Sequence, residues 1–440
     1  MLETLRNAWK LEDLRKKMLY TGMIILVFRI GSIIPVPFLI PEVLAQAAIM
    51  QGGTLSFFNM MTGGAFAMAT LFALGISPYI TASIILQLLQ VAIPALERLS
   101  KEGEAGRKKL TQITRWSTVG LSLFMASAYY IMNRNLGAVR YTTGFSGWFT
   151  MAVIISSFTA GAILIVWLGE AIDKKGIGNG ISIILFAGII SGGPRVAIAL
   201  WDLLRAAGEG ITALYAIVPL VLIVFLVLIA GIIMMSNSER RIPVQYSKRV
   251  VGRKMYGGQS SFIPVKVMMS GVMPIIFASA LLSIPMMISG FASPNPEGWF
   301  YRFLGLFDPS HLVYALLYLF LIIAFNYFYV GIQYNPIQMA NDLRKNNGAI
   351  PGIRPGKPTS DFMAKVIGKI TLIGGLFVAL VAILPIIMNA VARFIVGYQH
   401  FQLPLALGGT SIIIIVGVAL DTVRSLESQM MMRHYKGFLE

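Results

Sequence analysis

This sequence of 440 residues contains no cysteine and little charge. Without cysteine the chain can form neither a disulfide framework nor a thiolate metal site. Only 12% of its residues are charged, while 56% are hydrophobic, and soluble domains usually carry about 25% charged residues. The composition therefore excludes an ordinary soluble domain and indicates a membrane protein.

Ten apolar stretches approach the length of about 20 residues that is needed to cross a bilayer. So many such stretches cannot be explained by soluble cores or by helices lying in the membrane plane. The sequence therefore predicts an all-α, polytopic membrane protein with ten transmembrane helices. The predicted spans lie near residues 19–38, 70–92, 114–132, 149–169, 180–199, 211–235, 266–289, 311–333, 369–390 and 404–421.

Lysine and arginine fall almost entirely on alternate connections between these stretches. Of the 36 basic residues, 29 lie on one side of the predicted membrane, including those near both chain ends. Basic loops stay in the cytoplasm, so we expect both termini to be cytoplasmic. The net charge of +17 is then explained largely by topology and by attraction to anionic lipid headgroups, rather than by nucleic acid.

Acidic residues are missing from the middle of every predicted span, although the chain has 19 of them. A proton or sodium relay needs intramembrane carboxylates or comparable ligands. The spans also contain no Ser/His/Asp set, carboxylate pair or metal-ligand spacing. These absences count against an ion-coupled transporter and against an enzyme, and we predict no cofactor, no metal and no catalytic residue. The pattern favours a passive conduit or a scaffold.

Three polar side chains nevertheless fall inside spans, namely Arg29, Gln87 and Asn326. Arg29 could mark a pathway, but snorkelling or a satisfied contact between helices is the expected explanation. For Gln87 and Asn326 we expect hydrogen bonds between helices, although either could line a polar seam.

One apolar segment, residues 54–62, is too short to cross a bilayer and lies between the glycine pairs Gly52-Gly53 and Gly63-Gly64. It can be an external interfacial helix. It can also be a re-entrant helix inside the bundle, because incomplete spans are tolerated only when buried in protein or lining a cavity.

The ten spans divide into two halves, residues 1–200 with spans one to five and residues 201–440 with spans six to ten. An odd number of spans per half means that the halves enter the membrane from opposite sides. Inverted repeats of this kind place the functional site at their interface. We see no obvious sequence identity between the halves, so the pseudo-symmetry rests on the span count alone.

The segment Leu71–Gln87, LFALGISPYITASIILQ, resembles the second-span signature of the SecY protein-translocation channel family. The resemblance continues in the family's order through residues 102–107, 176–182, 271–274, 351–356 and 408–411. These blocks extend over nearly the whole chain, which is identified as a bacterial member of the family.

The resemblance implies an hourglass of ten helices whose halves enclose a central pore closed at its waist by a ring of apolar side chains. The sequence spacing agrees in part with this ring. Ile80 and Ile84 are four residues apart, as are Ile181 and Leu185, and residues four apart share one face of a helix. Spacing alone leaves open that these side chains face lipid. Leu185 stands where relatives often have isoleucine, and a similar volume should preserve the seal. The ring implied by the resemblance is Ile80, Ile84, Ile181, Leu185, Ile276 and Ile414.

The glycine-bounded segment, about residues 54–65, matches the family's plug, a short helix that blocks the outer funnel. The plug residues implied are Leu55, Phe57, Phe58, Asn59, Met60 and Met61. The resemblance also implies a lateral gate, where the second and third spans part from the seventh and eighth. Ser83, Gln87 and Ser279 are the polar contacts we expect along that seam.

Two long basic loops, about residues 236–266 and 334–369, contain glycine and proline. Such loops are either disordered tethers or docking surfaces, and the turn chemistry of residues 350–356 favours an ordered docking surface. The resemblance implies that they receive the motor ATPase SecA or the ribosome, through residues that match the family's motifs. These are Lys248, Arg249, Arg253, Lys254 and Arg354. Lys254 replaces an arginine of many relatives, and the loop charges could equally serve topology alone.

The expected function is a protein-conducting channel that passes unfolded secretory polypeptides across the cytoplasmic membrane and releases hydrophobic segments laterally into it. The partners implied are the SecE and SecG subunits, SecA, the ribosome, signal peptides with their nascent or preprotein chains, and membrane lipids. The alternatives are an ion-coupled secondary transporter and a membrane-embedded enzyme or lipid scramblase.

Overall fold

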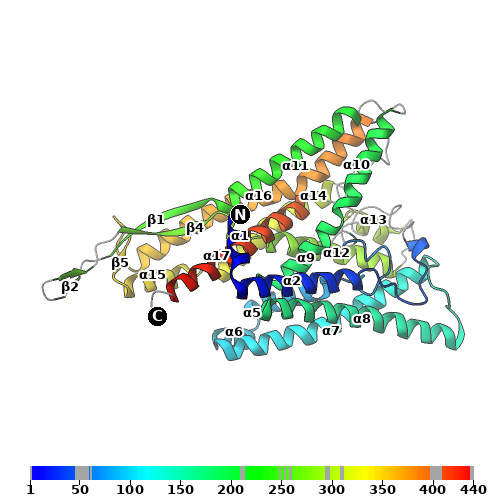
Figure 1. Ribbon diagram of the computed structural model, residues 1–440, viewed down its shortest axis with the longest axis horizontal. Coiled ribbons are helices and arrows are strands. Elements are labelled where there is room, and N and C mark those ends of the chain that lie inside the picture. The colour runs from blue at the N-terminus through cyan, green and yellow to red at the C-terminus, as the bar shows by residue number, and fades with distance from the viewer. Residues whose placement is uncertain are drawn as a thin grey trace.

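A computed structural model describes residues 2–44, 59, 62–208, 214–246, 249–251, 254–256, 260–292, 298–307, 312–396 and 409–436. Figure 1 shows an elongated bundle of helices from which a β-ribbon projects at one end. The ribbon consists of β1 and β4, and β2 lies at its tip (Figure 1). The predicted all-α class is therefore confirmed for the membrane part, whereas the two long basic loops contain strands.

Helices make up most of the described chain. Those of the first half are α1 Leu2–Lys10, α2 Glu12–Gly31, α5 Ser77–Ala92, α6 Pro94–Lys101, α7 Glu104–Asn135, α8 Gly144–Lys175, α9 Gly180–Ser191 and α10 Gly193–Gly208. Those of the second half are α11 Leu214–Asn237, α12 Met273–Ala292, α13 Trp299–Gly305, α14 Leu312–Gln333, α15 Pro336–Lys345, α16 Lys357–Val396 and α17 Gly409–Lys436.

Length and hydropathy single out six helical segments within the described residues that are able to cross a membrane, or seven if the bent pair α5 and α6 counts as one span. Four of the six are the single helices α8, α11, α16 and α17. The other two are pairs, α9 with α10 and α14 with α15. The protein is thus a multi-pass membrane protein. All ten predicted spans overlap a helix, so the count of ten is consistent with the structure and stays a prediction.

Several helices begin, end or break elsewhere than the predicted spans. The span predicted from residue 70 begins as a helix only at Ser77, after a turn in which Gly75 has a φ of +56°. The span predicted for residues 180–199 is interrupted at Gly192, between α9 and α10. Helix α16 begins at Lys357 rather than near residue 369, so the second basic loop ends in helix. Glycine allows the backbone to turn where the apolar pattern continues without a break.

Each half of the bundle has a hydrophobic core of its own. In the first half, Met125 of α7 and Phe158 of α8 pack against the segment that contains Val36 and Leu39. In the second half, buried side chains of α11, α12, α14, α16 and α17 form one cluster. Close packing of these side chains holds each half together. In lipid there is no hydrophobic force that drives helices to associate, so van der Waals packing between them supplies the stabilisation.

The two halves meet along two seams. On one seam α12 packs against α5 and α7, and on the other α17 packs against α9. The terminal helices strengthen the second seam. Thr4 Oγ1 of α1 donates a hydrogen bond to Glu427 Oε1 of α17 at 3.1 Å, and Lys17 Nζ of α2 donates to Gln429 Oε1 at 3.0 Å. The first helices of the chain therefore contact its last helix.

The first basic loop is a long antiparallel hairpin. Strand β1, Glu239–Tyr246, pairs with β4, Ser260–Lys266. The short strands β2, Arg249–Val251, and β3, Lys254–Tyr256, extend it. The second basic loop adds β5, Gly348–Ala349, to the other edge of β1. Side chains of both loops share a small hydrophobic cluster that includes Val244, Val265, Leu343 and Ile350.

Candidate functional site

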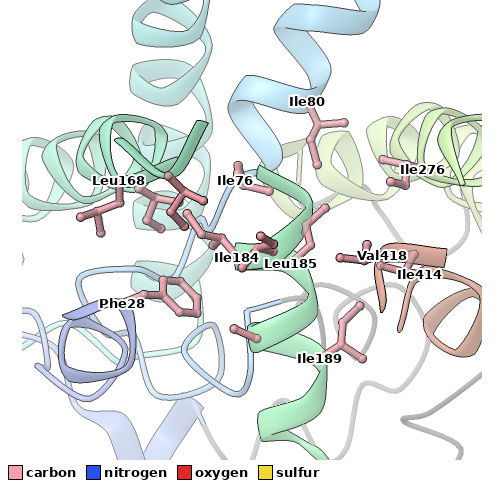
Figure 2. Close-up of a cluster of buried hydrophobic side chains, with 14 of the residues drawn as sticks. Phe28, Ile76, Ile80, Leu168, Ile184, Leu185, Ile189, Ile276, Ile414 and Val418 are labelled. Atoms are coloured by element: carbon pink, nitrogen blue, oxygen red, sulfur yellow. The ribbon is translucent and has the colours of Figure 1, made fainter. Parts of the chain in front are cut away.

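The six side chains expected to form the ring lie in one hydrophobic cluster. Ile80 and Ile84 come from α5, Leu185 from α9, Ile276 from α12 and Ile414 from α17, and all five are at most 8% exposed. Ile181 of α9 is half-buried and packs against the same cluster. Figure 2 shows Ile80, Leu185, Ile276 and Ile414 gathered from four different helices. Two of these helices belong to each half, so the cluster lies where the halves meet.

Helix α9 reaches this cluster because its first turn lies close against α8. A Cβ atom at Gly180 would lie 2.0 Å from the Gly169 carbonyl oxygen, so only glycine fits there. The Gly180 amide donates to Asp173 Oδ1 at 2.7 Å, and the Asn179 side chain caps the helix by accepting from the Ser182 amide at 3.1 Å. These contacts satisfy amides that a helix start leaves free and set the position of Ile181 at the next residue.

The sequence interpretation missed further members of the cluster. Val418 is buried and lies one turn beyond Ile414 on α17, and Ile76 is buried one turn before Ile80; both are labelled in Figure 2. A spacing of four residues along a helix would have found both. Ile189 of α9 also belongs to the cluster and follows the same spacing, because it lies four residues after Leu185. Phe28 of α2 belongs to the cluster too, and no spacing rule connects it to the ring.

The cluster is apolar throughout. Its buried members are aliphatic, aromatic or alanine side chains, and none carries a charge. A narrow constriction lined by such side chains excludes ions because water leaves it. Branched aliphatic side chains offer no specific hydrogen bond to a substrate, so the same surface can contact a polypeptide of any sequence.

The three polar residues expected along the lateral seam form hydrogen bonds within their own helices. Gln87 Nε2 donates to Ser83 Oγ at 3.2 Å on α5, and Ser279 Oγ donates to the Ile276 carbonyl oxygen at 2.9 Å on α12. Helix α12 of the seventh predicted span packs against α5 of the second and α7 of the third. The contact between these helices is therefore present, and the role of the three polar side chains in a lateral gate stays a prediction. For Gln87 the expected hydrogen bond between helices is wrong, because its amide donates within α5.

Five of the six predicted plug residues, Leu55, Phe57, Phe58, Met60 and Met61, lie outside the described residues. Asn59 is described, and it organises the turn that follows. Its carbonyl oxygen accepts from the Gly64 amide at 2.7 Å, and its Oδ1 accepts from the Ala67 amide at 3.0 Å. The Tyr129 hydroxyl of α7 donates to the Phe66 carbonyl oxygen. The segment after the predicted plug is therefore bound to α7 of the first half.

Two of the polar residues inside spans behave differently from one another. Asn326 of α14 has the expected contacts between helices, because its amide accepts from Ser270 Oγ and donates to the Thr371 carbonyl oxygen of α16 at 2.7 Å. For Arg29 of α2 the expectation of a satisfied contact is wrong. Its Nη1 is buried and has no hydrogen-bond partner.

Three of the five predicted docking residues are described, and they lie in the two joined basic loops. Arg249 and Lys254 occupy the paired strands β2 and β3, while Lys248 and Arg253 lie outside the described residues. Arg354 is exposed in the turn before α16, where Thr359 Oγ1 donates to its carbonyl oxygen at 2.9 Å. Within the part of the chain that the structure describes, no group of three or more histidine, aspartate or glutamate residues could hold a metal ion.

Comparison with known proteins agrees with this arrangement. The family model described as SecY matches residues 70–423. Two relatives, each called protein translocase subunit SecY, come from Mycobacterium tuberculosis, with 40% identity over 455 residues, and Streptomyces coelicolor, with 43% identity over 451 residues; each alignment covers 100% of both chains.

Solved structures share the fold at lower sequence identity. One described as "The structure of a protein conducting channel" has a TM-score of 0.63 at 19% identity and covers 94% of this chain and 92% of that one. Another, "Sec61 in the Canine ribosome-channel complex from the endoplasmic reticulum", has a TM-score of 0.60 at 18% identity, with the same coverage. The full-length identity to the curated relatives and the matching fold lead to one conclusion: the chain belongs to the SecY family and is a protein translocase subunit.

Proposed function

We propose that this translocase subunit conducts unfolded polypeptides through the junction of its two halves, with Ile80, Ile84, Ile181, Leu185, Ile276 and Ile414 as the seal. The observation that carries the proposal is the convergence of these side chains from four helices, two in each half, into one apolar cluster. Residues 54–65 would form a plug on the outer side of this seal. A chain in transit would displace the plug and separate the cluster.

The seam between α12 and helices α5 and α7 is the proposed lateral gate. Its two sides are parts of different halves, and Ser83, Gln87 and Ser279 each bond within their own side. Opening the seam therefore breaks neither of these two hydrogen bonds. A hydrophobic segment would leave sideways into lipid, because about 20 apolar residues are more stable in the bilayer than in water.

The proposed orientation places both termini and both basic loops in the cytoplasm of a cell whose cytoplasmic membrane holds the protein. The bias of lysine and arginine supports this orientation. The halves, residues 1–200 and 201–440, would be related by inverted topology, with the pore at their interface. Energy would come from partners, since the proposed channel has no catalytic activity of its own.

The joined unit of β1, β4, β5 and the turn with Arg354 is the proposed docking surface for SecA or the ribosome. A shared hydrophobic cluster holds its two loops together, so it offers a defined surface rather than two free tethers. One solved structure that shares the fold is described as part of a ribosome-channel complex. SecE and SecG are the proposed membrane subunits beside this chain.

Site-specific crosslinking tests the proposal, and the absence of native cysteine allows single cysteines to be used as unique probes. A stalled nascent chain that carries a signal sequence should crosslink to cysteine at Ile80 or Ile276. Cysteine at Ile373 is the matched control, because this isoleucine of α16 is 57% exposed on the outer surface and should give no adduct. An ion-coupled transporter, a membrane enzyme or a scramblase would give no adduct at any of the three positions.

A further inference from the structure

Arg424 of α17 holds the junction at which α11 ends and the first basic loop begins. Its Nη2 donates hydrogen bonds to the Ser236 carbonyl oxygen and to Asn237 Oδ1, each at 2.9 Å. The last carbonyl groups of a helix have no partner within the helix, and a cation beside them also interacts favourably with the helix dipole. The last helix of the described chain therefore supplies a partner that the end of α11 lacks.

The same junction joins the two strands of the long hairpin. Ser238 is bonded back to α11, because its hydroxyl donates to the Met234 carbonyl oxygen at 2.6 Å and its amide donates to the Met235 carbonyl oxygen at 3.2 Å. The Ser238 carbonyl oxygen accepts from the amide of Val267, which directly follows β4, at 3.0 Å. The base of the hairpin is thus one hydrogen-bonded unit, and Arg424 binds that unit to α17.

Helix α17 leads from this junction to the central apolar cluster. Ile414 and Val418 are buried members of the cluster, and they lie on the same helix as Arg424, Gly409–Lys436. At a rise of 1.5 Å per residue, Arg424 is about 9 Å beyond Val418 along the helix axis. A displacement of the hairpin base can therefore be carried by one helix to two side chains of the cluster.

Helix α12 provides a second connection between the hairpin and the cluster. Residues 267–272 join β4 to α12, and Ile276 lies in the first turn of α12. A Cβ atom at Gly417 of α17 would lie 2.8 Å from Val272 Cγ1, so α17 lies close against the chain that enters α12. The hairpin thus reaches one cluster helix of the second half through the chain itself and the other through Arg424.

We propose that Arg424 couples a partner docked on the two basic loops to the apolar seal. It is a positioning residue, because it holds α17 to the hairpin base and has no contact with the seal itself. When the hairpin moves, Ile414 of α17 and Ile276 of α12 would withdraw together from α5 and α9. This inference rests on the proposed function, since it takes the central cluster as the seal and the joined loops as the docking surface.

Single-channel recordings of the reconstituted complex in planar bilayers, with and without SecA and ATP, measure how strongly docking opens the channel. Arg424→Met removes the charge and both hydrogen bonds. Coupling between two sites typically changes an equilibrium 5–150-fold, so we expect the SecA-induced rise in open probability to fall at least about fivefold. The open probability without SecA and the affinity for SecA should stay unchanged, which a merely structural defect would not allow. A response equal to that of the unmodified protein would overturn the inference.

Two variants at the same position and on the same helix are the controls. Arg424→Lys keeps a cationic donor and should respond more strongly than Arg424→Met. Asp421→Asn removes the carboxylate that lies 3.7 Å from Arg424 Nη1, and this carboxylate side chain is 74% exposed. Exposed ion pairs contribute little, so Asp421→Asn should respond normally. A loss for Asp421→Asn as large as that for Arg424→Met would assign the effect to the charges of α17 and overturn the inference.

Asn237→Ala tests the contact from its other side. Asn237 is exposed, and the substitution removes one acceptor of Arg424, so the response to SecA should fall. Because both side chains belong to one contact, their losses should not add, and Arg424→Met with Asn237→Ala should lose no more than Arg424→Met alone. Additive losses would mean that the two residues act independently and would overturn the inference.

The unmodified protein separates this inference from the proposed function. If SecA binds but does not raise its open probability, the assignment of the docking surface and the seal fails, and the role of Arg424 fails with it. If SecA opens the unmodified channel and the Arg424→Met channel equally, the proposed function stands and the role of Arg424 alone fails.

Discussion

Gln245 of β1 pairs with Ala349 of β5, so the two basic loops, which the long helices α12 and α14 separate in the sequence, form one sheet. Neither loop has a sizeable core of its own. Their shared cluster, with Val244 from the first loop and Ile350 from the second, makes them a single unit. A partner that contacts one loop therefore contacts a surface whose shape depends on both.

Reversing the charge of Arg354 should block SecA-driven secretion while the protein still inserts and accumulates normally. Arg354 is exposed, so its replacement disturbs no core, whereas Arg354→Glu places a negative charge on a basic surface and lowers both contacts and encounter rate. Secretion into reconstituted vesicles measures the effect. Lys365→Glu is the control, since Lys365 is also exposed on nearby α16; normal secretion by Arg354→Glu would remove this residue from the docking surface.

Deleting residues Leu55 to Met61 should preserve folding and some secretion but raise the ion conductance of the resting channel. The segment is too short to be a span, so its loss should leave the topology unchanged. Conductance of reconstituted channels without a substrate is the measurement. Unchanged conductance together with lost secretion would show that the segment is structural.

Ile276→Asn or Ile414→Asn should loosen the closed state and admit substrates with defective signal sequences. Both side chains are buried in the apolar cluster, at 6% and 2% exposure, and an amide without a partner there costs about 1–3 kcal/mol. That cost falls mainly on the closed pore, because an open pore is wetter and hydrates the amide. Each 1.4 kcal/mol raises the open fraction roughly tenfold.

A secretion reporter with a defective signal sequence measures this relaxation. Ile373→Asn, at an exposed isoleucine of α16, is the control and should reduce the amount of channel without relaxing its selectivity. Strict rejection of the reporter by both cluster variants at normal abundance would contradict the seal.

Asn326→Leu should destabilise the second half of the protein by about 1–3 kcal/mol, because it leaves the buried Ser270 hydroxyl and the Thr371 carbonyl oxygen without their partner. Thermal unfolding of the detergent-solubilised protein measures the change. Gln333→Leu, at an exposed position at the end of the same helix, should have almost no effect. Equal stabilities of the two variants would mean that the asparagine does not join α14 to α16.

The sequence by itself was sufficient for the class of protein, the alternation of basic loops and the family. These properties depend on local composition: about 20 apolar residues in a row specify a span, and basic connections specify its orientation. Ile80 and Ile84 could be assigned to one helix face for the same reason, since their spacing is a property of one helix.

Only the tertiary structure decided what the ring residues face and which loops act together. Whether Ile276 faces lipid or the centre depends on the positions of α5, α9 and α17, and no local pattern encodes the rotation of one helix against another. The pairing of Gln245 with Ala349 and the unsatisfied nitrogen of Arg29 likewise depend on segments far apart in the chain. Burial is a property of the assembled bundle, because the side chains that enclose an atom come from helices that only folding brings together.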